Sequence, residues 1–186
     1  MMPRTRRATS RTVEQVLHAG RAAQRRRALN LSRVELGGLV RECLELARLR
    51  HGLDAEAIRY VESPDARGAA VSGDREELRA AVSNLLDNAV KYSDQNVSVE
   101  VEVAPLGERT LAVRVRDRGI GIHRNQLKRI FKRFYRVPGH FMARFKGTGL
   151  GLFIVRSIVE KHGGRVFAES AGLGQGSTFT IHLPRA

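Results

Sequence analysis

The sequence predicts an α+β fold, a two-layer α/β sandwich with helices on one face of a mixed, mainly antiparallel sheet. Residues 74–91 place apolar side chains at helical spacing along one stripe. Residues 97–103 and 111–115 alternate apolar with polar side chains across a turn that contains Pro105 and Gly107, which is typical of a hairpin. Residues 165–170 and 177–183 follow as two further strands around a glycine-rich turn. Helices and strands that are apolar on one face only must bury those faces against each other.

The first part of the chain divides into a basic tail and the start of a domain. Residues 1–30 hold eight arginines against one glutamate, a net charge of +7, which predicts a partly helical or disordered tail. The folded domain is predicted to cover residues 31–186. Residues 33–36 alternate like a short strand, residues 39–47 have helical spacing, and residues 58–61 and 69–71 are two more short strands.

The clearest helix is predicted to start at Asp74, with Glu77 three residues later as in a capping box. Asn84, Asn88 and Lys91 follow at i, i+4 and i+7, so they project along one line beside the apolar stripe. Asparagine is a poor helix former. The two asparagines are therefore either surface accidents with local hydrogen bonds or part of a binding site.

Two glycine-containing stretches are candidate ligand contacts. Asp117 leaves a strand into Gly119 and Gly121, which places a carboxylate at the rim of a pocket; a helix-capping turn is the alternative. Gly147, Gly149 and Gly151 open onto an apolar helix that runs to about residue 161. Bare backbone at a helix start suits a phosphate, although a plain tight turn has the same composition. Between them we expect a short helix over 125–131 and a mobile flap over 134–146.

Composition limits the possible functions. No apolar run approaches the roughly 18 residues of a membrane span, and the N-terminus lacks the apolar stretch of a secretory signal, so we expect a cytoplasmic protein. The single cysteine, Cys43, excludes an internal disulfide. Residues 123–146 contain eight Lys and Arg and no acid, a charge of +8 that suits nucleic acid, an acidic protein face or polyphosphate.

Five motifs in order resemble the ATP-binding domain of sensor histidine kinases. They are residues 84–92, 117–122, 131–136, 147–152 and 174–179, and they are similar to the N, G1, F, G2 and G3 boxes of that family. The resemblance covers about residues 31–186. It implies the Bergerat ATP-binding fold, which the wider group of gyrase, Hsp90 and MutL ATPases shares.

The resemblance implies a role for each motif residue. Asn88 would ligate Mg²⁺, whose other ligands include the triphosphate. Asn84 and Lys91 would lie near the phosphates, and Asp117 would accept a hydrogen bond from the adenine amino group. Tyr92 would flank the nucleotide and Ile122 would pack on a ring admitted by Gly119 and Gly121. The remaining predicted nucleotide contacts are Gly147, Thr148, Gly149, Leu150, Gly151, Leu152 and Ser177.

The predicted catalytic residues are Asn84, Lys91, Arg133 and Arg136, with the two arginines as candidates to meet the γ-phosphate. This assignment explains much of the positive charge of residues 123–146 and makes nucleic acid an unlikely partner. In hydrolytic members and in anti-sigma-factor serine kinases, a glutamate stands where this chain has Asn84. The Asn84 amide cannot act as a base, which favours phosphoryl transfer to an imidazole over hydrolysis, since an imidazole is already a nucleophile when neutral.

The family's phosphoacceptor motif, a histidine followed by an acid and a Thr-Pro or Asn-Pro pair, is absent from this sequence. The chain is therefore expected to use ATP and Mg²⁺ to phosphorylate a separate histidine-containing dimerisation or phosphotransfer protein, which would feed a response regulator. Lys132 also departs from the family, where an acid is common. Alternatives are an ATP-sensing module or degenerate kinase that docks an acidic partner, and a serine kinase of the anti-sigma type.

Overall fold

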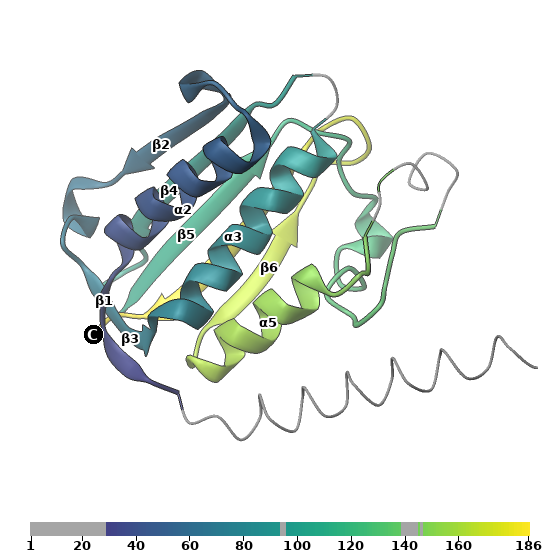
Figure 1. Ribbon diagram of the computed structural model, residues 1–186. Coiled ribbons are helices and arrows are strands. Elements are labelled where there is room, and N and C mark those ends of the chain that lie inside the picture. Colours follow the sequence, from purple (N-terminus) through teal and green to yellow (C-terminus); the bar gives the residue numbers. More distant parts are fainter. Residues whose placement is uncertain (1–28, 94–95, 139–144, 146) are drawn as a thin grey trace, which may run out of the picture. The chain divides into compact units, whose positions relative to one another are not determined.

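A five-stranded sheet forms one layer of the domain, in the order β2-β4-β5-β7-β6 (Figure 1). The strands are β2 (Ile58–Glu62), β4 (Val99–Pro105), β5 (Thr110–Asp117), β6 (Arg165–Glu169) and β7 (Ser177–Pro184). Only β2 runs parallel to its neighbour β4, and the other pairs are antiparallel. The mixed, mainly antiparallel sheet expected from the sequence is confirmed.

The computed structural model describes residues 29–93, 96–138, 145 and 147–186. The predicted basic tail, residues 1–30, lies almost entirely outside the described residues, and its structure and its boundary at residue 31 stay predictions. Within the described part of the chain, no helix is long and apolar enough to cross a membrane.

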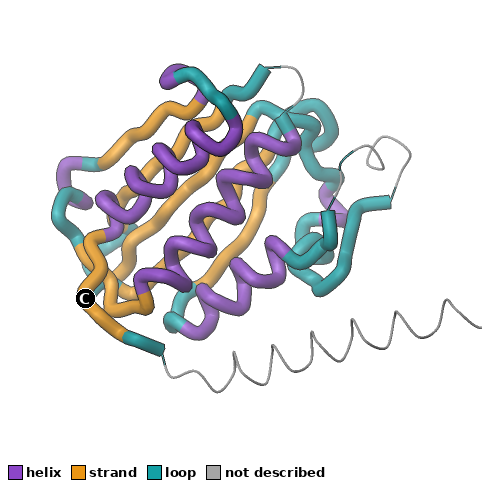
Figure 2. The backbone as a smooth tube through the Cα atoms, in the orientation of Figure 1, coloured by secondary structure: helices purple, strands orange, loops and turns teal. Residues whose placement is uncertain are grey.

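Three helices lie over one face of this sheet, and Figures 1 and 2 show them side by side. They are α2 (Leu36–His51), α3 (Arg75–Tyr92) and α5 (Gly151–Lys161). Their apolar stripes pack on alternate strand residues such as Val101, Val113 and Ile181, all at most 2% exposed. The other face of the sheet carries charged side chains, and Arg114 Nη1 lies 2.7 Å from Glu102 Oε2 across β4 and β5. The two-layer sandwich is therefore the observed fold.

A second, two-stranded sheet joins β1 (Leu31–Glu35) and β3 (Ala70–Asp74), which run antiparallel. The sequence predicted these strands at 33–36 and 69–71, but not their pairing. Their pairing partner is decided by tertiary packing, since short strands carry no register signal of their own. Two single 3-10 turns, Ala55–Ala57 and Pro64–Ala66, flank β2.

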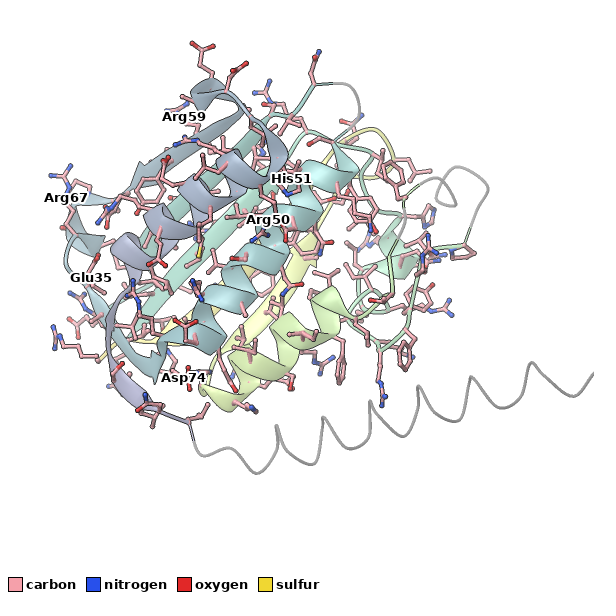
Figure 3. The ribbon with its side chains drawn as sticks, in the orientation of Figure 1. Glu35, Arg50, His51, Arg59, Arg67 and Asp74 are labelled. Carbon is pink, nitrogen blue, oxygen red and sulfur yellow. The ribbon has the colours of Figure 1, made fainter. Side chains whose placement is uncertain are left out.

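The predicted capping box at the start of α3 is half correct. Asp74 Oδ1 accepts from the backbone N–H groups of Glu76 and Glu77, both at 3.1 Å. The reciprocal bond is absent, because Asp74 N–H donates to His162 Nε2 at 2.9 Å. Glu77 Oε1 instead accepts from Lys161 Nζ at 2.9 Å. These bonds tie the start of α3, where Figure 3 labels Asp74, to the end of α5.

The short helix predicted over 125–131 is wrong. Only one 3-10 turn, Arg124–Gln126, is helical there, and the next residues continue as turns. Most backbone bonds there run from an N–H to the third carbonyl before it, as in Arg129 N–H to Gln126 at 2.8 Å, although Ile130 N–H bonds to Gln126, four residues earlier, at 3.0 Å. Phe131 is buried in the core, where its ring centroid lies 6.4 Å from that of Phe179. Burial of the aromatic ring outweighs helical propensity in so short a segment.

Candidate functional site

A cavity of about 950 Å³ opens at one edge of the domain. It lies where the C-terminal half of α3, the end of β5 and the loop before α5 meet, and Figure 2 shows loops gathered at this edge. Residues 123–138, here called the cavity-edge segment, and the loop before β7 complete its wall. The volume lies in the range of small-molecule and cofactor sites.

The cavity brings together residues that are more than 90 positions apart in the sequence. Of the predicted site residues, those that line it are Asn84, Asn88, Lys91, Tyr92, Asp117, Gly119, Gly121, Ile122, Arg136, Gly147, Thr148, Gly149, Gly151, Leu152 and Ser177. Arg133 and Leu150 are not in its lining. The five motifs therefore converge on one site, while the role of each residue stays a prediction.

Asp117 is a buried charged side chain in the lining of the cavity and is only 5% exposed. Its Oδ1 accepts from the backbone N–H groups of Gly119, at 2.9 Å, and Ser177, at 3.2 Å. Burial raises the pKa of the Asp117 carboxyl, and these two backbone donors act in the opposite direction. Among the described residues nothing donates to Oδ2. Asp117 is thus fixed by one oxygen and offers the other to a ligand.

The two glycines after Asp117 are required by close backbone approach. A Cβ on Gly119 would lie 2.1 Å from the carbonyl oxygen of Tyr92. Gly121 has φ +68°, and a Cβ there would lie 2.0 Å from the carbonyl oxygen of Gly172. Only glycine fits both positions without moving the backbone. The turn therefore brings three loops together around the Asp117 end of the cavity.

Asn84 and Asn88 differ in their local bonds. Asn84 Nδ2 donates to the carbonyl oxygen of Ala80 at 2.8 Å, the local bond that a purely structural role would provide. Its Oδ1 takes no part in that bond and faces Gly151, where an added Cβ would lie 3.0 Å away. The half-buried Asn88 amide makes no hydrogen bond with any described residue. A half-buried amide without a protein partner is a candidate ligand contact.

Lys91 places a positive charge beside the glycine loop. Its Nζ lies 2.6 Å from the point that a Cβ would occupy if residue 147 were not glycine. The same Nζ lies 4.8 Å from the centroid of the Tyr92 ring. The Tyr92 ring in turn packs on Phe145, with centroids 5.1 Å apart. No carboxylate in the described part of the chain pairs with Lys91. The ammonium group is thus available to an anion at the glycine loop.

The two arginines predicted to be catalytic, Arg133 and Arg136, occupy different places. Arg136 lines the cavity, and its Nη2 donates to the carbonyl oxygen of Phe145 at 2.6 Å. Arg133 lies outside it, with its guanidinium carbon 4.7 Å from the centroid of the Phe134 ring. The predicted flap falls partly on residues 139–144 and 146, which are outside the described residues. A shared role for both arginines at the γ-phosphate would therefore require Arg133 to move.

Five motif residues to which the sequence analysis gave no role also line the cavity: Arg118, Ile120, Tyr135, Gly174 and Phe179. The lining residues outside the motifs are His123, Asn125, Gln126, Ile130, Val137, Pro138 and Leu173. Leu173 is 70% exposed and stands between two glycines, and that isolated apolar residue is a sequence signal for a lining residue outside the motifs. Gln126 accepts a hydrogen bond from the Tyr135 hydroxyl. Side chains from turns have no periodicity that could predict their direction.

The cavity has two chemically different ends. One end offers the Asp117 carboxylate among apolar side chains such as Ile122 and Phe179, which suits a flat ring with an amino group. The other end offers Lys91, two asparagine amides and bare glycine backbone before the N-terminus of α5, which suits an anion. A ligand that fills both ends carries a polar ring and an anionic tail.

Comparison with known proteins agrees with this chemistry. The model of the family described as histidine kinase-, DNA gyrase B- and HSP90-like ATPase matches residues 73–186. The chain belongs to this family. The match begins just before the Asp74 cap of α3 and includes every predicted site residue. The family relation and the Bergerat-type sandwich expected from the motifs are both confirmed.

Sensor kinases are among the most similar curated proteins. The sensor protein kinase WalK of Staphylococcus aureus is 37% identical over 137 residues, which are 73% of this chain and 32% of that protein. In a WalK sequence from strain NCTC 8325 / PS 47 the same match covers 22% of the protein. The chain therefore spans about a third or less of the length of these relatives.

Solved structures of histidine kinases share the fold. A mycobacterial sensor histidine kinase, MprB, superposes with a TM-score of 0.69 at 29% identity, over 85% of this chain and 98% of that one. Full-length ShkA in complex with AMPPNP also gives 0.69 at 29% identity, over 86% of this chain and 32% of ShkA. The nucleotide-free catalytic domain of ThkA gives 0.68 at 25% identity, over 83% and 97% of the two chains.

Proposed function

We propose that this chain is the ATP-binding catalytic part of a two-component histidine kinase, and that it phosphorylates a histidine on a separate protein. That protein would pass the phosphoryl group to an aspartate of a response regulator, in the cytoplasm. The observation that carries the proposal is the two-ended cavity, with Asp117 at one end and Lys91 with the glycine loop at the other. Membership of the ATPase family and the similarity to ShkA with AMPPNP support ATP as the ligand.

Adenine recognition is proposed to depend on Asp117. Its Oδ2, to which no described residue donates a hydrogen bond, would accept one from the 6-amino group of adenine. Guanine presents an oxygen at that position, and two acceptors facing each other in a buried site are unfavourable. The fixed Oδ1 prevents the carboxylate from turning away. The site is therefore expected to select ATP over GTP.

The donor set fits a Mg²⁺ ion that arrives with the nucleotide. Mg²⁺ prefers oxygen ligands, and the Asn88 amide oxygen has no partner among the described residues. Asn88 would hold the ion, with phosphate oxygens and water as its other ligands. When bound, the ion would neutralise charge on the triphosphate. Lys91 and Arg136 would add fixed positive charge at the same end of the cavity.

The side chains present favour transfer to an imidazole over hydrolysis. A neutral imidazole nitrogen has a free lone pair, so it can form a bond to the γ-phosphorus without a base as the bond to ADP breaks. Asn84 cannot take a proton from water. The nearest carboxylate on α3, Asp87, does not line the cavity; it accepts from Arg50 Nη1 at 2.8 and 2.9 Å and contacts His51 Nε2 at 2.9 Å.

Action on a separate protein rests on the histidines of this chain. Both ring nitrogens of His162 are used, at Asp74 N–H and at the carbonyl oxygen of Ile158. His51 contacts Asp87, and His182 packs on Phe167 on the other face of the sheet. His123 lines the cavity, with its Nδ1 2.9 Å from Asn125 Oδ1. The test must therefore also look for label on the chain itself.

The test is incubation of the full chain with γ-labelled ATP, Mg²⁺ and candidate helical histidine proteins encoded near its gene. We expect acid-labile, base-stable label on the partner and none on the chain alone. The Asn88→Ala variant should lose both transfer and the rise in melting temperature that Mg²⁺-ATP gives the wild type. Label on His123, or on a serine of the partner, would contradict the proposal. Nucleotide binding without transfer to any partner would favour an ATP-sensing module instead.

A further inference from the structure

The exposed face of the cavity-edge segment carries positive charge, and the segment itself contains no acidic residue. Four exposed side chains make up this face, here called the basic surface: Arg124, Lys128, Arg129 and Lys132. None of them pairs with a carboxylate in the described part of the chain, and the sequence has no acid from residue 123 to residue 146. The local charge is therefore not neutralised by the fold itself.

The basic surface is held on an ordered support. Phe131 and Ile130, which lie between its cations, are 6% and 8% exposed and pack into the core. Backbone bonds join Gln126 to His123 and Lys132 to Arg129, both at 2.8 Å. The same segment therefore points apolar side chains inward and cations outward. A surface presented in this way suits a specific partner better than a flexible basic tail does.

The basic surface is next to the glycine loop. Phe134, two residues after Lys132, has φ +57°, an uncommon conformation for a residue with a side chain, and the residue is 50% exposed. A Cβ on Gly149 would lie 2.8 Å from the carbonyl carbon of Phe134. The backbone of the cavity-edge segment thus touches the loop that lines the anion end of the cavity. A molecule bound to the basic surface would sit beside the opening of the cavity.

The aromatic residues of the segment argue against single-stranded nucleic acid. Stacking of bases needs free ring faces. Phe131 is buried, Arg129 stacks on Tyr135 with 4.9 Å from the guanidinium carbon to the ring centroid, and Arg133 lies over Phe134. A membrane surface would need an amphipathic helix with a free apolar face. The segment forms only one 3-10 turn, and its apolar residues Ile130 and Phe131 are buried in the core.

We propose that Arg124, Lys128, Arg129 and Lys132 form a docking surface for an acidic face of a partner protein. The inference rests on the proposed function only in identifying that partner with the phosphoacceptor. Carboxylates of the partner would pair with the four cations around Phe134. Complementary charge of this kind sets orientation and association rate more than it sets affinity. It would bring the partner's reacting group to the edge of the cavity beside Gly149.

The test reverses three of these charges in the full chain, as Arg124→Glu, Lys128→Glu and Lys132→Glu. Arg129 is kept because it stacks on Tyr135. The matched control reverses three exposed arginines that have no ion pair among the described residues and do not line the cavity, as Arg67→Glu, Arg109→Glu and Arg185→Glu. Both variants undergo the same change in net charge. Melting temperature with and without Mg²⁺-ATP shows that each is folded and still binds nucleotide.

The probes are a labelled 20-residue Glu-Ala helical peptide, a 20-nucleotide oligothymidylate and vesicles that contain phosphatidylserine. We expect the variant with the reversed basic surface to bind the peptide about tenfold more weakly than the control variant does, since three exposed ion pairs become repulsive. An equal loss in both variants would overturn the proposal, because net charge alone would then explain it. A loss confined to the oligothymidylate or the vesicles would also overturn it. Nucleotide stabilisation tests the proposed function separately.

Discussion

The cations of the three helices and the cations around the cavity are used differently. On α2, α3 and α5, every Lys and Arg except Lys91 forms an ion pair with a carboxylate. Lys91 points into the cavity, and the basic surface beside it also lacks carboxylate partners among the described residues. Paired charges hold elements of the fold in register. Unpaired charges remain where an anionic ligand or partner is expected.

The difference shows that the charge pattern marks the site as clearly as the motifs do. An unpaired cation in a partly enclosed cavity is unfavourable unless a ligand neutralises it. On the helices, the exposed pairs contribute little stability each, so their loss should leave the cavity unchanged. Three substitutions and one pH titration can distinguish charges that bind the ligand from charges that pair on the helices.

The largest effect is expected for Asp117→Asn. The amide would keep one oxygen for the backbone N–H groups of Gly119 and Ser177 and would present its NH₂ to the ligand. Two donors would then face each other with ATP, whereas the oxygen of guanine would gain a donor. The ratio of ATP to GTP affinity should fall about 100-fold, as expected when a buried polar contact is mismatched. Fluorescent-nucleotide displacement measures the ratio, and an unchanged preference for ATP would show that Asp117 does not read the base.

Lys91→Ala should weaken ATP binding about tenfold, the loss of one charge-assisted contact, with little change in the free energy of unfolding. Calorimetric titration with ATP and with adenosine separates the phosphate end from the ring end. Adenosine affinity should be unaffected by this substitution. An equal loss for both ligands would mean that Lys91 supports the cavity wall through its contact with Tyr92 and does not bind the phosphates.

A pH effect of a few-fold is expected from Asp117. Burial raises its pKa above the ordinary carboxyl value, so the folded chain binds this proton more tightly than the unfolded chain does. Its contribution to stability is therefore lost as pH rises through the raised pKa. ATP affinity moves the other way: it should fall as pH drops through that pKa, because the adenine contact needs the carboxylate. The pH profile of Asp117→Asn should be flatter, and parallel profiles would contradict this assignment.

The smallest effect is expected for Arg156→Ala on α5. Arg156 Nε lies 2.7 Å from Glu160 Oε1, and both side chains are about half exposed. Removing such an i,i+4 pair costs about 0.3–0.5 kcal/mol of unfolding free energy. Urea denaturation measures this cost, and ATP titration of the same variant should match the wild type. A weakening of ATP binding similar to that of Lys91→Ala would break the distinction between the two groups of charges.

Local patterns predicted the regular part of the fold well. The α3 stripe and the alternation of β4 and β5 depend on periodicity, which is a property of the chain itself. The short helix over 125–131 was wrong, because burial of Phe131 decided the local winding. The reciprocal capping bond to Glu77 was predicted but does not form, because Asp74 N–H donates instead to His162 at the end of another helix. Both errors arise where a distant contact outweighs a local preference.

The sequence by itself determined which residue types are available for the site. Two asparagines and a lysine on one line, an acid before glycines and a glycine-rich helix start were enough to predict an ATP-binding fold by resemblance. Only the tertiary structure decided that Asp117 Oδ2 and the Asn88 amide have no hydrogen-bond partner among the described residues, while Asp87 and His162 are engaged. It also placed Arg133 outside the cavity lining and the basic surface beside the glycine loop. The reason is physical: periodicity fixes which face a side chain takes, but its partners come from elements far away in the chain.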